Sequence, residues 1–317
     1  MNDLAVIFPD HQKLTKSKKE IRVFGIDLGT TNSSIAEITW LTGSKSPIVA
    51  RCIEVAQDTL EGMYTHVLIP SVVALYQGKV FIGEGAKRLR SQAPELGLAQ
   101  NKNLFYECKN DMGILKTYHM APEGFRSAAT IGGRVLGFLY KSGLEDDSTS
   151  VDRIVVTVPA SFQGAQRNDT LKAAELAGLE LSGGDLLDEP VSAFLDYLLT
   201  HKELFAEDIR IPKNLLIFDF GGGTCDVAVF KMMVSSQGSP LKIAPLSVSR
   251  YHRLGGGDID KTIIYDILMQ QLQAQNNLSQ HDLSYEEKKN FIEPELLGIA
   301  EALKIGLCTE ISRLILN

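Results

Sequence analysis

A strand–turn–strand pattern occurs twice in this chain, and this duplication constrains the fold more than any other feature of the sequence. Residues 23–38 read VFGIDLGTTNSSIAEI and residues 215–230 read LLIFDFGGGTCDVAVF, so that Asp27 of the first copy aligns with Asp219 of the second. In each copy an apolar strand ends at the aspartate, and a turn of small residues leads into a second apolar strand. Such turns let the backbone approach a ligand closely, and their successive N–H groups form a concave site for anions. We therefore expect two lobes whose turns face each other and hold one polyphosphate with its metal ion.

The composition limits the class of protein. A length of 317 residues is enough for about two domains. The net charge of −7 argues against a nucleic-acid-binding protein, which normally has a basic face. No apolar run approaches the roughly 18 residues of a membrane span, and the N-terminus does not form a secretory signal. We expect a cytoplasmic protein, because its cysteines match neither a zinc site nor a disulfide framework: Cys52, Cys108, Cys225 and Cys308.

Expected strands and helices alternate along the chain, which predicts an α/β fold with mixed sheets. Outside the second copy of the pattern, the expected strands are 22–27, 34–39, 47–56, a strand-rich stretch at 61–83 with a turn at Gln77–Gly78, 153–158 and 180–187. The expected helices are 84–96, 121–141, 165–177 ended by Gly178, one opened by Pro190, 260–273, 285–292 with a capping box of Ser284 and Glu287, and 294–307. The last six residues, SRLILN, are typical of a strand.

Five strings occur in order along the chain: GIDLGTTNS, TVPASF, LLDEP, FDFGGGTCDVAV and LGGGDID. Together they resemble the ATPase domain of the seventy-kilodalton heat-shock chaperones, the DnaK-type family, from about residue 22 to about residue 308. The resemblance implies an actin-like, ribonuclease H-like fold of two lobes with mixed sheets and a central nucleotide cleft. It also implies that ATP or ADP and Mg²⁺ are bound there.

The same resemblance implies a division of the chain. A flexible N-terminal arm is expected at 1–21, and lobe I at 22–212, with a core at 22–55 and 130–212 and an outer subdomain at 56–129. Lobe II is expected at 213–317, with a core hairpin at 213–252 and an outer subdomain at 253–317. The chain is expected to stop before the family's second glycine-rich adenosine loop, so that lobe II is incomplete.

Acidic residues are predicted to hold the metal ion. Magnesium prefers oxygen ligands and keeps several of its waters, so Asp27 and Asp219 at the two strand ends are predicted to bind it through water. The resemblance adds Glu189, in the string LLDEP. The alternative is that each aspartate only caps its own turn by bonding the nearby backbone.

Small and hydroxyl residues of the turns are predicted to bind the phosphates. Residues of a later helix are predicted to bind the adenosine. The alternative for the turns is that they are tight for packing reasons alone. The alternative for Glu301 and Lys304 is that they form an ordinary ion pair at the surface. Ile305 stands where the family usually has an arginine against the adenine, which leaves adenine selectivity open. The predicted nucleotide-binding residues are Gly29, Thr30, Thr31, Asn32, Gly221, Gly222, Gly223, Gly255, Gly256, Gly257, Glu301, Lys304 and Cys308.

Catalytic roles follow from the resemblance. Lys87, in IGEGAKRLR, matches the family lysine that approaches the γ-phosphate and the attacking water, where its charge would stabilise the transition state. The alternative is an ordinary solvated helix face. Asp226 is predicted to orient or deprotonate the water. The full predicted catalytic set is Lys87, Glu189, Asp219, Thr224 and Asp226.

Three functions remain open at this stage. The first is the slow ATPase domain of a chaperone that acts in protein folding and the stress response. For it the family implies a J-domain co-chaperone and a nucleotide-exchange factor, with the client peptide site outside this chain. The second is a nucleotide-sensing or scaffold relative that does not hydrolyse ATP, favoured by Ile305 and by Gly164 where the family has an acidic residue. The third, a small-molecule kinase, is disfavoured by the strings TVPASF and LLDEP.

Overall fold

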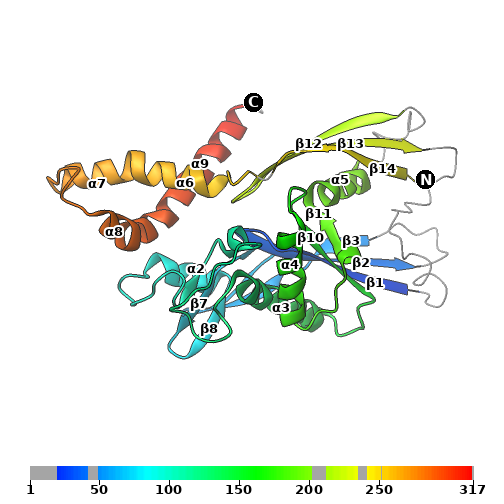
Figure 1. Ribbon diagram of the computed structural model, residues 1–317, viewed down its shortest axis with the longest axis horizontal. Coiled ribbons are helices and arrows are strands. Elements are labelled where there is room, and N and C mark those ends of the chain that lie inside the picture. Colours follow the sequence, from blue (N-terminus) through cyan, green and yellow to red (C-terminus); the bar gives the residue numbers. More distant parts are fainter. Residues whose placement is uncertain (1–19, 42–48, 202–211, 235–240, 251, 316–317) are drawn as a thin grey trace.

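The computed structural model describes residues 20–41, 49–201, 212–234, 241–250 and 252–315. Figure 1 shows two bodies, which we call lobe I (β1 to α5) and lobe II (β12 to α9). Residues 1–19 of the expected N-terminal arm lie outside the described residues, and the expected domain boundaries stay a prediction. No helix in the described ranges is long and apolar enough to cross a membrane.

Lobe I is built on a mixed sheet, which has six strands within the described residues, in the order β11-β10-β1-β2-β3 with β6 beside β2. The first hairpin is antiparallel, whereas β10 runs parallel to β1 and β11 parallel to β10. The hairpin predicted from the first copy of the pattern is therefore present at the centre of the sheet. The strands are β1 (Glu20–Asp27), β2 (Asn32–Leu41), β3 (Val49–Cys52), β6 (Ile69–Pro70), β10 (Arg153–Val158) and β11 (Leu186–Asp188).

Helices α3 (Ala128–Asp146) and α4 (Gly164–Leu176) pack on each other, and α3 covers this sheet. The fully buried Phe24 and Ile35 of the first hairpin lie in one apolar core with Leu136 of α3, and each such side chain stabilises the fold by about 1.5–3 kcal/mol. Gly143 allows the close approach, because a Cβ there would lie 2.8 Å from the Phe24 ring.

Two helix ends test the sequence predictions in lobe I. Gly178 follows α4 with a φ of +78°, as expected for a residue that ends a helix. The prediction of a helix from 121 is wrong, because α3 begins only at Ala128. Ser127 accepts a hydrogen bond from the Thr130 N–H at 3.2 Å, which caps the helix there, and the Phe125 N–H closes a separate turn on Pro122.

The outer part of lobe I contains two small antiparallel sheets and a short helix. Its apolar cluster includes Phe81, Leu89 and Leu104. The helix predicted over 84–96 ends early, because Pro94 disfavours helical geometry in the residue before it. The elements are β4 (Val55–Thr59), β5 (Gly62–His66), β7 (Val73–Tyr76), β8 (Lys79–Ile82), α2 (Glu84–Ser91), β9 (Leu104–Phe105) and the 3₁₀ turn η1 (Cys108–Asp111).

Lobe II begins with a sheet that has three antiparallel strands in the described part of the chain, in the order β12-β13-β14. Leu215 and Ile217 on one face of β12 contact Phe194 of α5 (Glu189–Thr200), which joins this sheet to lobe I. The other face of β12 is open: Leu216 is 69% exposed and Phe218 is 64% exposed. The strands are β12 (Lys213–Phe220), β13 (Cys225–Val234) and β14 (Leu241–Val248).

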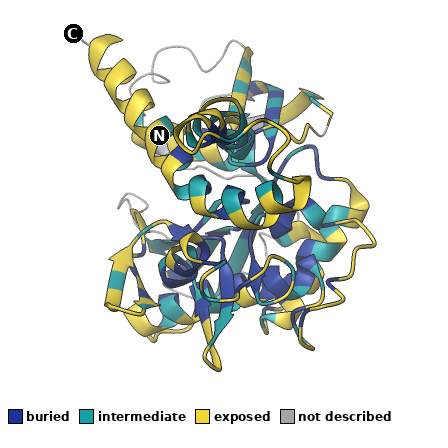
Figure 2. Cartoon of the chain, turned by 90° about the vertical axis from the view of Figure 1, so that its left-hand side faces the viewer, coloured by how far each residue is buried: buried dark blue, intermediate teal, exposed yellow. Residues whose placement is uncertain are grey.

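The rest of lobe II is helical. Leu297 and Ala300 of α9 pack against Ile264 and Met269, and the capping box of Ser284 and Glu287 is present as predicted. Figure 2 shows exposed residues along α9, in contrast to the largely buried interior of lobe I. The elements are α6 (Gly256–Ile263), η4 (Ile264–Leu268), α7 (Met269–Gln275), α8 (Tyr285–Glu287), η5 (Lys288–Ile292) and α9 (Glu293–Ile315).

Two predicted strands are corrected by the structure. The string SRLILN was expected to form a strand, but 312–315 are the last turn of α9, where Arg313 bonds Glu310 at 2.8 Å across one turn, and 316–317 lie outside the described residues. The strand expected over 180–187 is confined to Leu186–Asp188, because Ser182 and Asp185 close a short turn before it. In both cases the apolar run was too short to distinguish a strand from a helix end or a turn.

Candidate active site

The two copies of the turn lie against each other. A Cβ on Gly222 would overlap the Thr31 hydroxyl, and one on Gly223 would lie 2.6 Å from Cγ2 of Thr30. Only glycine permits this approach of the second turn to the first. The β12–β13 hairpin brings its turn here, because its register pairs Asp219 with Asp226 and ends at Phe220 and Cys225, which leaves the three glycines and Thr224 to form the turn.

A third glycine segment joins them. The N–H of Gly256 donates to the Gly221 carbonyl at 2.9 Å, and that of Gly257 to the Gly222 carbonyl at 2.8 Å. A Cβ on Gly255 would lie 2.5 Å from the Gly223 nitrogen. The N-terminus of α6 therefore starts beside the second turn, which is a position suited to anions.

Four carboxylates surround the meeting point of the turns. Burial raises the pKa of Glu189 to about 7; nearby Lys109 lowers this pKa, whereas Asp27 and Asp219 raise it further. Burial also raises the pKa of Asp219, followed by the charges of Asp226 and Asp27. Asp27 and Asp219 thus repel Glu189, and Asp226 and Asp27 repel Asp219, and this repulsion would be relieved by a bound cation.

One of these carboxylates is already engaged by the protein. Asp27 accepts a hydrogen bond from the Thr157 hydroxyl at 2.7 Å, so one of its oxygens already has a partner. Within the described ranges, no three acidic, histidine or cysteine side chains are close enough to ligate one ion directly. Binding through the waters of the ion was the form that the sequence predicted, and it stays a proposal.

Lys109 is a site residue that the sequence reasoning missed. Its Nζ lies 2.6 Å from Oε1 of Glu189, its exposed fraction is 8%, and it stands 5.7 Å over the Phe162 ring. The lysine comes from η1, in a segment that the sequence indicated only as irregular. No local pattern in the string YECKNDM marks it.

Lys87 is paired with a residue of lobe II in this structure. Its Nζ forms an ion pair with Oε2 of Glu301 at 2.9 Å, which links α2 of lobe I to α9 of lobe II, and Arg90 lies 3.8 Å from the same oxygen. Lys304 binds Asp260 at 2.7 Å and the Gly256 carbonyl at 3.0 Å. The alternative that Glu301 and Lys304 merely pair with each other at the surface is therefore wrong.

One cavity between the lobes is small. A cavity of about 30 Å³ is lined by Thr30, Arg90, Gly257, Asp260 and Glu301, among others, and has room for a water molecule or two but no nucleotide. Two of the remaining predicted residues belong to the turns: Thr224 is buried in the second turn, and Asn32 begins β2 next to Gly29. Cys308 is exposed on α9.

Three buried oxygen atoms around the cleft have no hydrogen-bond partner among the described residues. They are Oδ1 of Asn110, Oδ1 of Asp226 and Oδ1 of Asp260. Buried polar atoms in native proteins are almost always paired, so such a group indicates a ligand or water that completes the site. Carboxylate and amide oxygens beside glycine turns fit a hydrated divalent cation with phosphate groups.

Comparison with known proteins gives consistent matches. The family model described as Hsp70 protein matches residues 23–315. The chain is 32% identical over 246 residues to the chaperone protein DnaK of Mycoplasmopsis agalactiae, covering 78% of this chain and 35% of that protein. It is 31% identical over 289 residues to the chaperone protein DnaK of Ureaplasma urealyticum serovar 10 and to that of Ureaplasma parvum serovar 3, covering 91% of this chain and 40% of each. The chain therefore spans well under half the length of these curated relatives.

Proposed function

Because the chain belongs to the Hsp70 family and has its actin-like, two-lobed fold, we propose that the cleft binds Mg-ATP and hydrolyses it slowly to ADP and phosphate. The observation that carries this proposal is the contact between the two turns, together with the charge effects that link Asp27, Glu189, Asp219 and Asp226. A triphosphate placed there would touch both lobes at once.

Backbone groups of the turns bind the phosphates in this proposal. The N–H groups of Gly222 and Gly223 and of Gly29–Thr31 donate to phosphate oxygens, helped by the hydroxyls of Thr30, Thr31 and Thr224, whereas the Gly221 N–H closes its own turn on the Thr224 carbonyl. Bound magnesium would neutralise charge on the β- and γ-phosphates. Asp27, Glu189 and Asp219 accept hydrogen bonds from its waters, and the pair with Lys109 keeps Glu189 in place for this role.

The water that attacks the terminal phosphoryl group is oriented by Asp226, whose Oδ1 is buried and unpaired in the described structure. Catalysis of this transfer depends mainly on positioning and electrostatics, so Asp226 assists rather than dominates. Lys87 stabilises the developing charge once it has left Glu301, which requires the lobes to open and close again around the nucleotide.

The role of the whole protein follows from its relatives and is part of the proposal. The family consists of ATPases, and the curated relatives are named chaperones. We propose that this region serves a cytoplasmic chaperone of the stress response, regulated by a J-domain co-chaperone and a nucleotide-exchange factor. Client peptides would bind outside these residues.

Phosphate release from Mg-ATP tests the proposal. The 317-residue chain is expected to release phosphate slowly, Lys87→Ala to release none, and the control Lys141→Ala, at an exposed position of α3, to match the unmodified chain. Binding of ATP without phosphate release in every variant would favour the non-hydrolysing sensor. Absence of both binding and release would refute the proposal.

A further inference from the structure

The 3₁₀ turn η1 brings a second polar side chain, Asn110, to the place where the glycine turns meet. A Cβ on Gly223 would lie 2.8 Å from Oδ1 of Asn110 and 3.0 Å from the Thr30 hydroxyl. A side chain of the outer part of lobe I, the first turn and the second turn thus converge on one point. Asn110 is 7% exposed.

The side chain of Asn110 has no evident structural task. Asparagine in a turn usually bonds the nearby backbone through its side chain. Here the turn is closed by the backbone instead, since the N–H of Asn110 donates to the Glu107 carbonyl at 3.0 Å. Oδ1 of Asn110 is buried without a partner among the described residues, and a buried amide that gains no hydrogen bond destabilises the folded chain.

The surroundings indicate which part of a nucleotide this amide would meet. Asn110 lies beside Gly223 and Thr30, both predicted to bind phosphates, and the neighbouring Lys109 pairs with Glu189, which is predicted to hold the metal ion. Glu301 and Lys304, the residues predicted for the adenosine, lie on α9. The terminal phosphoryl group, beside the metal ion, is therefore the part that comes next to Asn110.

We propose that the side-chain amide of Asn110 donates a hydrogen bond to the terminal phosphoryl group of ATP, and that it makes the cleft prefer ATP to ADP. Rotation of the amide by half a turn exchanges its oxygen for its NH₂ group, which is a donor. ADP lacks the terminal phosphoryl group and leaves the amide unpaired. This inference rests on the proposed function, because it assumes that nucleotide occupies the cleft.

The test is calorimetry of the 317-residue chain with ATP and with ADP, each with magnesium. In Asn110→Asp a negative charge replaces the donor, so ATP is expected to bind about 10- to 100-fold more weakly. ADP affinity is expected to change by less than about threefold. Asn110→Ala should lose about tenfold in ATP affinity only. The control Asn214→Asp adds the same charge at an exposed position of β12 and should change neither affinity.

Each outcome either supports or overturns the inference about Asn110. A selective loss of ATP affinity in both Asn110 variants supports the inference. An unchanged ratio of ATP to ADP affinity, while the unmodified chain binds both, overturns it and leaves the proposed function standing. Thermal unfolding without nucleotide distinguishes a structural role of Asn110 from a role in binding. Asn110→Ala removes an unpaired buried amide and should therefore not lower the unfolding temperature. A large drop would overturn the inference. If the unmodified chain binds neither nucleotide, the proposed function and this inference both fail.

Discussion

The ion pair between Lys109 and Glu189 should make stability depend on pH in a defined direction. Lys109→Met leaves Glu189 buried near two aspartates with no cation beside it. Removal of one partner of a buried pair costs about 3–5 kcal/mol when the other stays ionised. Glu189 can avoid this cost by taking up a proton, since its pKa is already raised to about 7.

The sign follows from proton linkage. In the unmodified chain the pKa of Glu189 rises on folding from 4.5 to about 7. Between these values the folded state holds a proton that the unfolded state has released, so its contribution to the unfolding free energy falls as pH rises and is level above about pH 7. Without Lys109 the pKa rises further. The unfolding free energy of Lys109→Met should then keep falling above pH 7, by about 1.4 kcal/mol per pH unit, relative to the unmodified chain.

Urea unfolding at pH 6, 7, 8 and 9 measures this difference. The control Lys116→Met removes a lysine that pairs with Asp111 at 2.6 Å but is 43% exposed, and it should cost less than about 1 kcal/mol at every pH. Adding Glu189→Gln to Lys109→Met removes the titrating group and should abolish the extra slope. A loss of stability in Lys109→Met that is the same at all four pH values would refute the reasoning.

Three further outcomes are expected. Gly222→Ala should lower the unfolding temperature and weaken Mg-ATP binding measured by calorimetry, because its Cβ overlaps the opposite turn, whereas Gly298→Ala, with open space around it, should do neither. Burial raises the pKa of the Cys108 thiol to about 12. Maleimide at pH 7.5 should therefore label the exposed Cys308 within minutes and Cys108 only in denaturant. Equal labelling of both thiols in the folded state would contradict the burial of Cys108. Phe218→Thr should reduce self-association in sedimentation velocity, since β12 exposes its apolar face; an unchanged sedimentation coefficient at high concentration would argue against that face as the contact.

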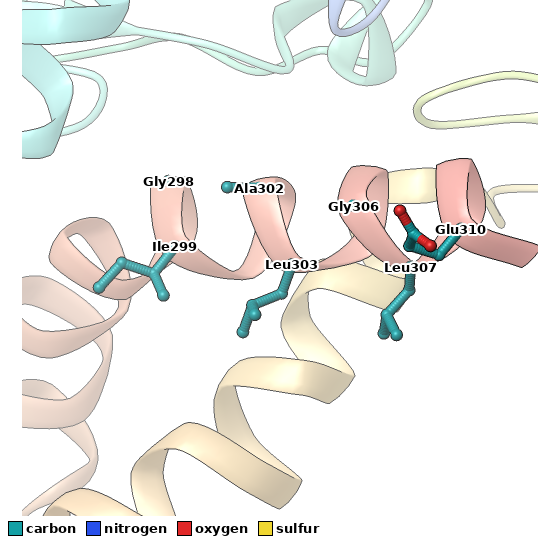
Figure 3. Close-up of a pocket in the computed structure, with 7 residues that line it drawn as sticks. All are labelled: Gly298, Ile299, Ala302, Leu303, Gly306, Leu307 and Glu310. Carbon is teal, nitrogen blue, oxygen red and sulfur yellow. The ribbon is translucent and has the colours of Figure 1, made fainter.

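A second exposed apolar surface lies on α9. Ile299, Leu303 and Leu307 project from the same side of the helix (Figure 3) and line a shallow hollow of about 570 Å³. A small residue directly precedes each of them, namely Gly298, Ala302 and Gly306. Like the open face of β12, this is an exposed apolar surface of the kind that promotes self-association.

Local structure could be predicted wherever a segment carries its own signal. The apolar residues of β1 and β2 and the small residues of the turn between them predicted the first hairpin, and the second copy predicted its counterpart. The start of α3 was placed too early, because the apolar periodicity continues before Ser127 whereas the cap acts at Ser127 itself. The end of α9 was mistaken for a strand, because a short apolar run fits either structure.

The sequence by itself determined which residues form the turns and which acids stand beside them, since a turn and its adjacent strand are contiguous in the chain. Only the tertiary structure decided that Lys109 pairs with Glu189, that Lys87 pairs with Glu301, and that Asn110 stands unpaired between the turns. These partners are separated by dozens of residues, and their distances depend on how helices and sheets pack. A pattern read along the chain records what each segment prefers, but contacts between segments arise from their packing in three dimensions.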